Sequence, residues 1–167
     1  RARMCGADLR EAVFDQCDLT GADFSGANLR GALFHQCRLG STRFNRASLH
    51  TVKIIESDAS QACFGQADLN LAFLAKSILV EADFEAALLD RMQFVECNVT
   101  QMRAREAHLH QVVWSDCAGR VGSLAGSQFT LTLFRHQDLG GMVFAGQRFD
   151  GCQFVESRLE GSDFNQA

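Results

Sequence analysis

The sequence contains no proline and no tyrosine, and it has only one tryptophan among its 167 residues. Proline cannot donate a backbone hydrogen bond, so its absence suits a chain whose N–H groups are nearly all held in β ladders. Phenylalanine, by contrast, occurs 14 times. A chain that uses phenylalanine but never tyrosine has no phenolic hydroxyl to satisfy in its core, which predicts a dry and closed interior.

Other absences narrow the class of protein. The formal net charge of −4 lacks the basic excess that a general nucleic-acid binder presents. No apolar run is long enough to predict a membrane-spanning helix, and no signal peptide is visible. The seven cysteines are odd in number and show no CxxC spacing, which favours a reducing compartment. The sequence therefore predicts a cytoplasmic domain that binds neither nucleic acid nor membrane.

An apolar residue recurs at every fifth position from Met4 to Phe164, without insertion or deletion. Of these 33 central residues, all are Phe, Leu, Met, Ile, Val or Trp except Ala59, Ala104 and Gly119. The residue two positions before each centre is usually small. Nine of the 14 glycines lie two positions after a centre, where a chain that turns a corner needs positive φ. A period of five fits neither a helix nor a flat strand.

These repeats resemble a known family. The segments ADLRE, CDLTG, ADFSG, ANLRG, ADLNL, ADFEA and SDFNQ are similar to the A(D/N)LXX consensus of the pentapeptide-repeat proteins, and the resemblance covers the whole chain. It implies an all-β fold, a right-handed quadrilateral (four-sided) parallel β-helix of about eight coils of 20 residues. Residues 1–167 then form a single domain, and the repeat runs to both ends, as it would in a segment of a longer protein.

Sorting the central residues by a 20-residue period gives four columns, which we number as walls. The first, second, third and fourth walls begin at Met4, Leu9, Phe14 and Leu19. Columns rich in phenylalanine alternate with columns rich in leucine. The sequence itself shows only the ten-residue alternation, and the four-sided closure is what the family resemblance implies.

The cysteines and histidines could suggest a metal or redox site. Four cysteines occupy the small inward position of the fourth wall: Cys17, Cys37, Cys97 and Cys117. A buried thiol that acts as a small apolar side chain is the favoured interpretation. His108 and His110 point outward, and no closed ligand set accompanies them. The sequence also lacks a GxSxG motif and a phosphate-binding loop. We expect no enzyme, no catalytic residue, no cofactor and no metal site.

An outward row of apolar residues gives the strongest functional signal. On the third wall, each coil carries one large apolar residue beside its centre, and such rows are seldom left bare on soluble monomers. The favourable stacking of β-branched residues on a strand is the other explanation for such a row. The candidate interface residues are Val13, Leu33, Ile55, Phe73, Val95, Val113, Leu133 and Val155.

Charge is banded along the chain. Residues 24–55 contain five basic residues and no acid, whereas residues 56–96 contain eight acids. Such a band can steer a complementary partner, and a solvated surface with chance clustering of charge is the equally favoured explanation. The candidate acidic patch comprises Asp68, Glu81, Asp83, Glu85 and Asp90.

Two functions follow from these surfaces. The first is a non-catalytic scaffold of a bacterial pentapeptide-repeat protein, which binds a protein partner or a second copy through the third wall. The family resemblance also implies that such a segment can be appended to a larger protein that a secretion system delivers. The second function is implied by relatives that mimic DNA and bind DNA gyrase, which confers quinolone resistance. The low net charge and the basic band beside the acidic one argue against it.

Overall fold

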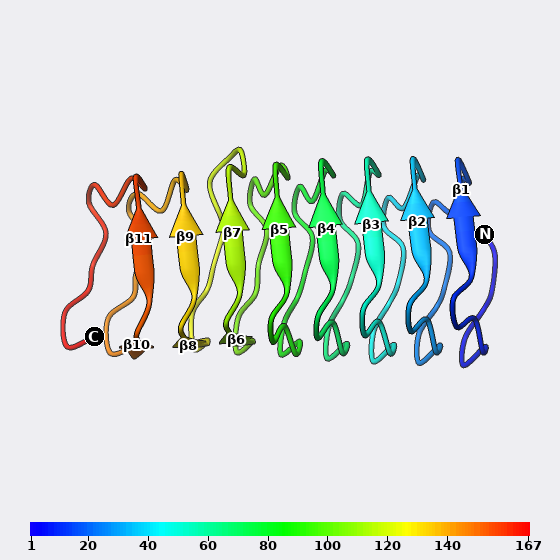
Figure 1. Cartoon of the computed structure of the whole chain (residues 1–167), viewed down its shortest axis with the longest axis horizontal. Coiled ribbons are helices and arrows are strands. Elements are labelled where there is room, and N and C mark those ends of the chain that lie inside the picture. Colours follow the sequence, from blue (N-terminus) through cyan, green and yellow to red (C-terminus); the bar gives the residue numbers. More distant parts are fainter.

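The computed structural model describes all 167 residues as one parallel β-solenoid (Figure 1). Eight short strands stack side by side in the order β1-β2-β3-β4-β5-β7-β9-β11. Their bounds are β1 Val13–Asp15, β2 Leu33–His35, β3 Lys53–Ile55, β4 Phe73–Ala75, β5 Gln93–Val95, β7 Val113–Ser115, β9 Leu133–Arg135 and β11 Gln153–Val155. This sheet is the third wall.

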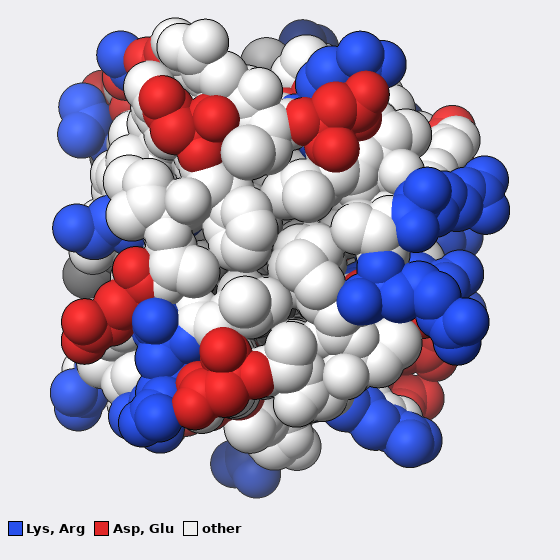
Figure 2. Space-filling view, turned by 90° about the vertical axis from the view of Figure 1, so that its right-hand side faces the viewer, with Lys and Arg blue, Asp and Glu red and all other residues white.

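The register of the sheet repeats every 20 residues, from the Val13–Leu33 pair to the Leu133–Gln153 pair. Seven complete turns therefore separate β1 from β11. The two termini lie at opposite ends of the rod (Figure 1). Figure 2 views the N-terminal end, where charged side chains form the periphery and the middle is uncharged.

The other three walls stack in the same register. Most of their pairs are isolated bridges 20 residues apart, such as Asp8 with Asn28 and Asp18 with Arg38. The second wall also forms a sheet of three strands, β10-β8-β6. These strands are β6 His108–His110, β8 Gln128–Thr130 and β10 Phe149–Asp150. The expected all-β, four-sided solenoid is confirmed. No helix in the fold is long and apolar enough to cross a membrane.

Aspartate before a central residue supports the turn in several coils of the other three walls. A carboxylate oxygen of Asp23 accepts a hydrogen bond from the N–H of Ser25 at 3.0 Å, and Asp58 accepts one from Ser60 at the same distance. Such local bonds draw the backbone out of the extended conformation. The third wall has no Asp or Asn at this position in any coil. The backbone of this wall is extended in every coil and forms the long sheet.

Each corner of the rod requires a left-handed backbone. All nine glycines predicted at corners have positive φ, and 23 residues other than glycine adopt it as well, among them Gln16, Leu71 and His136. Left-handed backbone costs an ordinary residue roughly 1–2 kcal/mol. The continuous ladders between coils hold these corners in place.

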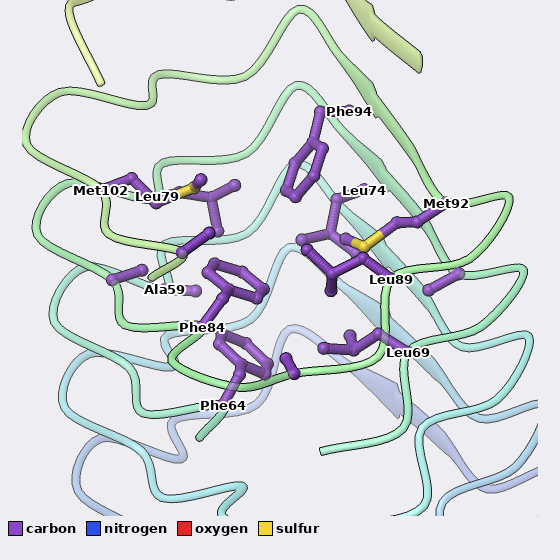
Figure 3. Close-up of a cluster of buried hydrophobic side chains, with 14 of the residues drawn as sticks. Ala59, Phe64, Leu69, Leu74, Leu79, Phe84, Leu89, Met92, Phe94 and Met102 are labelled. Atoms are coloured by element: carbon purple, nitrogen blue, oxygen red, sulfur yellow. The ribbon is translucent and has the colours of Figure 1, made fainter. Parts of the chain in front are cut away.

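The core is filled by the central residues of all four walls (Figure 3). Phe64 and Phe84 stack with their ring centroids 4.5 Å apart, one coil above the other. Ala104 is a small central residue, and the neighbouring inward position holds Met102 instead of a small side chain. Both are fully buried, so the larger side chain fills the volume that the smaller one leaves.

One expectation about the fourth wall was wrong. The five-residue pattern makes Gly119 a centre and points Val121 outward, but Gly119 is exposed and Val121 is buried. The left-handed backbone of Gly119, with φ of +84°, turns the chain so that Val121 enters the core in its place. The backbone of this segment therefore departs from the regular coil.

Candidate protein-binding wall

All eight candidate interface residues lie on the eight-stranded sheet of the third wall, whose arrows are shown in Figure 1. They form two parallel columns, one on each side of the buried centres. Val13 pairs with Leu33, and Val113 pairs with Leu133. On the other column Ala75 lies between Ile55 and Val95. The structure therefore sets the eight candidates along one face, with neighbouring strands 20 positions apart in the sequence.

Exposure differs along this wall. Val13 at one end is 68% exposed and Val155 at the other is 39% exposed. The six candidates between them are half-buried, because side chains on neighbouring strands cover one another. Polar side chains interrupt the apolar ones, because Lys53 lies between Leu33 and Phe73, and Gln93 lies between Phe73 and Val113. The wall thus presents a shallow, mixed surface with one large apolar residue in each coil rather than a pocket.

Two leucines extend this surface and were not among the candidates. Leu71 is 44% exposed and Leu131 is 52% exposed. They occupy left-handed corner positions at the end of the second wall, two residues before Phe73 and Leu133 of the third wall. The sequence pattern assigns them to the second wall. The positive φ expected at a corner is the signal that could have placed both leucines at the border between the second and third walls.

The opposite border of the third wall is a ladder of polar side chains. Gln16 donates a hydrogen bond to Gln36 at 3.3 Å, and Gln36 donates one to Glu56 at 2.9 Å. Further along the rod, the imidazole of His136 lies between two carboxylates. One belongs to Asp116, and the other belongs to Glu156 at 2.6 Å.

The two neighbouring carboxylates, Asp116 first and then Glu156, raise the pKa of His136 above its ordinary value. A raised pKa in the folded state means that this ladder stabilises the fold below the pKa of the unfolded chain, about 6.5. That contribution is lost as the pH rises through the folded-state pKa. We expect NMR titration of His136 to give a midpoint above about 6.5, and Asp116→Asn to lower it. A midpoint that does not change in the variant would contradict this account.

The candidate acidic patch is divided between walls. Asp83 and Glu85 lie on the first wall, and Asp68 and Asp90 lie on the second. Glu81 lies at the corner before the first wall, where it accepts a hydrogen bond from Gln61 at 3.0 Å.

Two acids of the patch face arginines of the next coil. Asp83 lies 3.4 Å from Arg103, and Glu85 lies 3.2 Å from Arg105. The 20-residue stacking thus sets acidic residues of one coil directly against basic residues of the next. The patch is therefore less uniformly negative than the sequence suggests.

The buried cysteines pack as small side chains. Cys37 and Cys97 donate weak hydrogen bonds to carbonyl oxygens of the third wall, at 3.2 and 3.4 Å. Burial raises the pKa of the Cys37 thiol. His108 and His110 flank the buried Leu109 on β6, as expected. No group of three His, Cys, Asp or Glu side chains lies close enough to hold a metal ion.

The stacked five-residue units and the four walls define a right-angled β-solenoid. Family models agree with this fold. The model described as pentapeptide repeats matches eight copies, over residues 1–36, 32–70 and 127–166. A second, described as a pentapeptide repeat region, matches residues 67–144. The chain belongs to the pentapeptide repeat family.

The chain is similar to several solved structures. A trypsin-treated form of QnrB1, described as a plasmid-mediated fluoroquinolone resistance protein, is 24% identical with a TM-score of 0.58. The match covers 91% of this chain and 77% of that one. HetL, a pentapeptide repeat protein from the cyanobacterium Nostoc sp. strain PCC 7120, is 15% identical with a TM-score of 0.48, over 95% of this chain and 87% of its own. No curated protein matches the sequence.

Proposed function

We propose that this chain is a non-catalytic interaction module that binds a partner protein through its third wall. The observation that carries the proposal is the row of outward apolar residues, one large one on each of the eight stacked strands. Every strand of this wall is paired with its neighbours, so the surface is rigid and costs little conformational entropy on binding. Its apolar side chains release water when a partner covers them.

The border of the wall favours a particular partner chemistry. The polar corner ladder holds four carboxylates, Glu56, Glu96, Asp116 and Glu156, and one lysine, Lys76. We propose that the partner presents an apolar strip with basic residues along one side, because charge complementarity aligns partners and excludes others.

A double substitution tests this proposal. We expect Phe73→Asp with Val113→Asp to abolish association with a partner or a second copy, because two carboxylates would have to lose water against an apolar surface. Circular dichroism and the melting temperature should remain close to those of the parent chain, since both side chains point outward. Association is measured by sedimentation for self-assembly, and by binding of an identified partner to the immobilised chain.

A matched control uses outward apolar residues of other walls. Ile78→Asp with Leu88→Asp adds the same charge on the fourth and second walls, at positions that are 43% and 40% exposed and so more open than the half-buried Phe73 and Val113. This control should keep the association. An association that survives in the third-wall variant, or that both double variants lose equally, would contradict the proposal.

As part of the proposal, we place the module in the bacterial cytoplasm or within a larger protein that is secreted. Buried thiols packed as small apolar side chains suit a reducing compartment. A gyrase-binding mimic of DNA would need a more extended acidic surface than the divided patch, in which Asp83 and Glu85 are paired with arginines. We therefore favour the third wall.

A further inference from the structure

One boundary between coils lacks its backbone ladder. No backbone hydrogen bond of ordinary geometry joins residues 117–128 to residues 138–148. At the previous boundary the ladder is complete on the same walls, for example from Val99 to Ala118 at 2.8 Å and from Ala104 to Ser123 at 2.9 Å. We call the boundary between residues 117–128 and 138–148 the seam.

The seam is open on the first wall and at the start of the second wall, and the fourth wall crosses it with a single bridge. The second wall closes again where β8 pairs with β10, and Leu131 donates a hydrogen bond to Asp150 at 2.7 Å where this wall ends. Beyond it, β7 pairs with β9 and β9 pairs with β11 over three residues each. The third-wall sheet and the short β8–β10 pairing therefore hold the two parts of the rod together.

Bulky polar side chains accompany the opening. Gln137 and Gln147 occupy inward positions that hold small residues in the other coils, such as Ser57 on the fourth wall and Ala67 on the second. Gln137 is only 1% exposed. On the fourth wall, the bridge across the seam joins Arg120 to Asp138, two residues out of the usual register.

The buried polar atoms confirm that packing here is imperfect. Three buried side-chain atoms in the molecule have no hydrogen-bond partner: Trp114 Nε1, Gln137 Oε1 and Gln147 Oε1. All three belong to the coils that border the seam. Unpaired buried groups of this kind are costly and mark sites where water enters.

The aromatic column of the first wall is also interrupted at this place. It stacks continuously from Phe24 to Phe84, and then passes through Ala104 and Leu124 before Phe144. Surface hollows lie over the seam on both open sides. One is lined by residues that include Leu124 and Val143, and the other by residues that include Ser127 and Arg148.

We propose that the seam is a hydrated hinge. Water satisfies the unpaired backbone groups of its two sides, and the coils separate there while the third-wall sheet stays intact. Opening on the first-wall side makes the third wall the inner side of the bend. The rod can therefore curve its apolar wall around a partner. This inference rests on the interrupted ladder and the packing beside it, and it would stand if the third wall bound nothing.

Hydrogen exchange on the intact chain, followed amide by amide by NMR, tests the hinge. The amides of Val121, Leu124 and Gly126 should exchange at least about tenfold faster than their counterparts one coil earlier, because local opening exposes unpaired amides first. Those counterparts are Gln101, Ala104 and Glu106. Equal protection in the two coils would overturn the proposal.

A second variant tests the cause of the opening. Gln137→Ser with Gln147→Ala restores the small residues of the other coils and should slow exchange at the seam towards the rate of the earlier coil. Gln111→Ala, at an exposed corner away from the seam, should leave the exchange pattern as it is. If the amides at the seam exchange as fast in the double variant as in the parent chain, the two glutamines are not the cause of the opening.

Discussion

An aspartate in place of Phe94 is expected to abolish folding, whereas an aspartate in place of its neighbour Val95 should be tolerated. Phe94 is fully buried, with its ring 4.3 Å from Trp114 and 5.8 Å from Phe84 between centroids. An unpaired carboxylate there costs several kcal/mol even when it becomes protonated. That cost is comparable with the roughly 5–15 kcal/mol that stabilises a typical domain.

Val95 follows Phe94 on the same strand, and its side chain faces the outer side of the sheet instead of the core. Its side chain lies on the outer surface of β5, where a carboxylate keeps its water. Circular dichroism and size-exclusion chromatography of the two variants measure the difference. A folded Phe94→Asp variant, or an unfolded Val95→Asp variant, would show that the inward and outward sides have been assigned wrongly.

Phe84→Ala is expected to lower the free energy of unfolding by about 3–5 kcal/mol. The ring is fully buried, stacks on Phe64 at 4.5 Å, and meets Phe94 edge to face. Neighbouring coils cannot move in to fill the cavity, because their separation is set by the hydrogen-bonded ladders on all four walls. Urea unfolding followed by circular dichroism measures the loss.

Phe84→Leu is the control for this cavity. The same column already accepts leucine at Leu124, so the leucine variant should lose clearly less stability than the alanine variant. Equal losses in the two variants would mean that the aromatic stack, rather than the filled volume, supplies the stability at this position.

The sequence predicted the fold well, because in a solenoid the position of a residue within the repeat decides its surroundings. The fivefold spacing placed Phe84 inward, and the four-sided coil that the family resemblance implies placed it above Phe64. It also placed all eight apolar candidates on one wall before any strand was known. No long-range pairing had to be guessed, since each coil stacks on the one before it.

The five-residue pattern predicted the wrong positions where the sequence keeps the repeat but the backbone departs from the regular coil. Val121 is at an outward position by counting, and yet it replaces Gly119 in the core. Gln137 and Gln147 could be recognised as unusual inward residues. The five-residue repeat cannot show that the backbone ladder is interrupted beside the two glutamines. The interruption depends on the balance between the volume of their side chains and the hydrogen bonds of the ladder.

The functional surface was only partly predictable for a similar reason. The sequence identified the third wall, but it could not give the exposed fraction of each side chain, which depends on how neighbouring side chains cover one another. Val13 is therefore much more exposed than the candidates at the middle of the wall. The acidic residues are close in sequence, but stacking divides them between walls and sets Asp83 and Glu85 beside arginines. Whether either surface binds a partner stays a prediction.

The strict 20-residue register restricts how the length of such a protein can change. Removal of one pentapeptide would rotate every later unit by a quarter turn, so phenylalanine columns would continue as leucine columns and the apolar wall would pass to an adjacent side. Removal or duplication of four pentapeptides returns each unit to its own wall and only shortens or lengthens the rod. A lineage of these proteins can therefore change its length in whole coils while it keeps the same face towards the same partner.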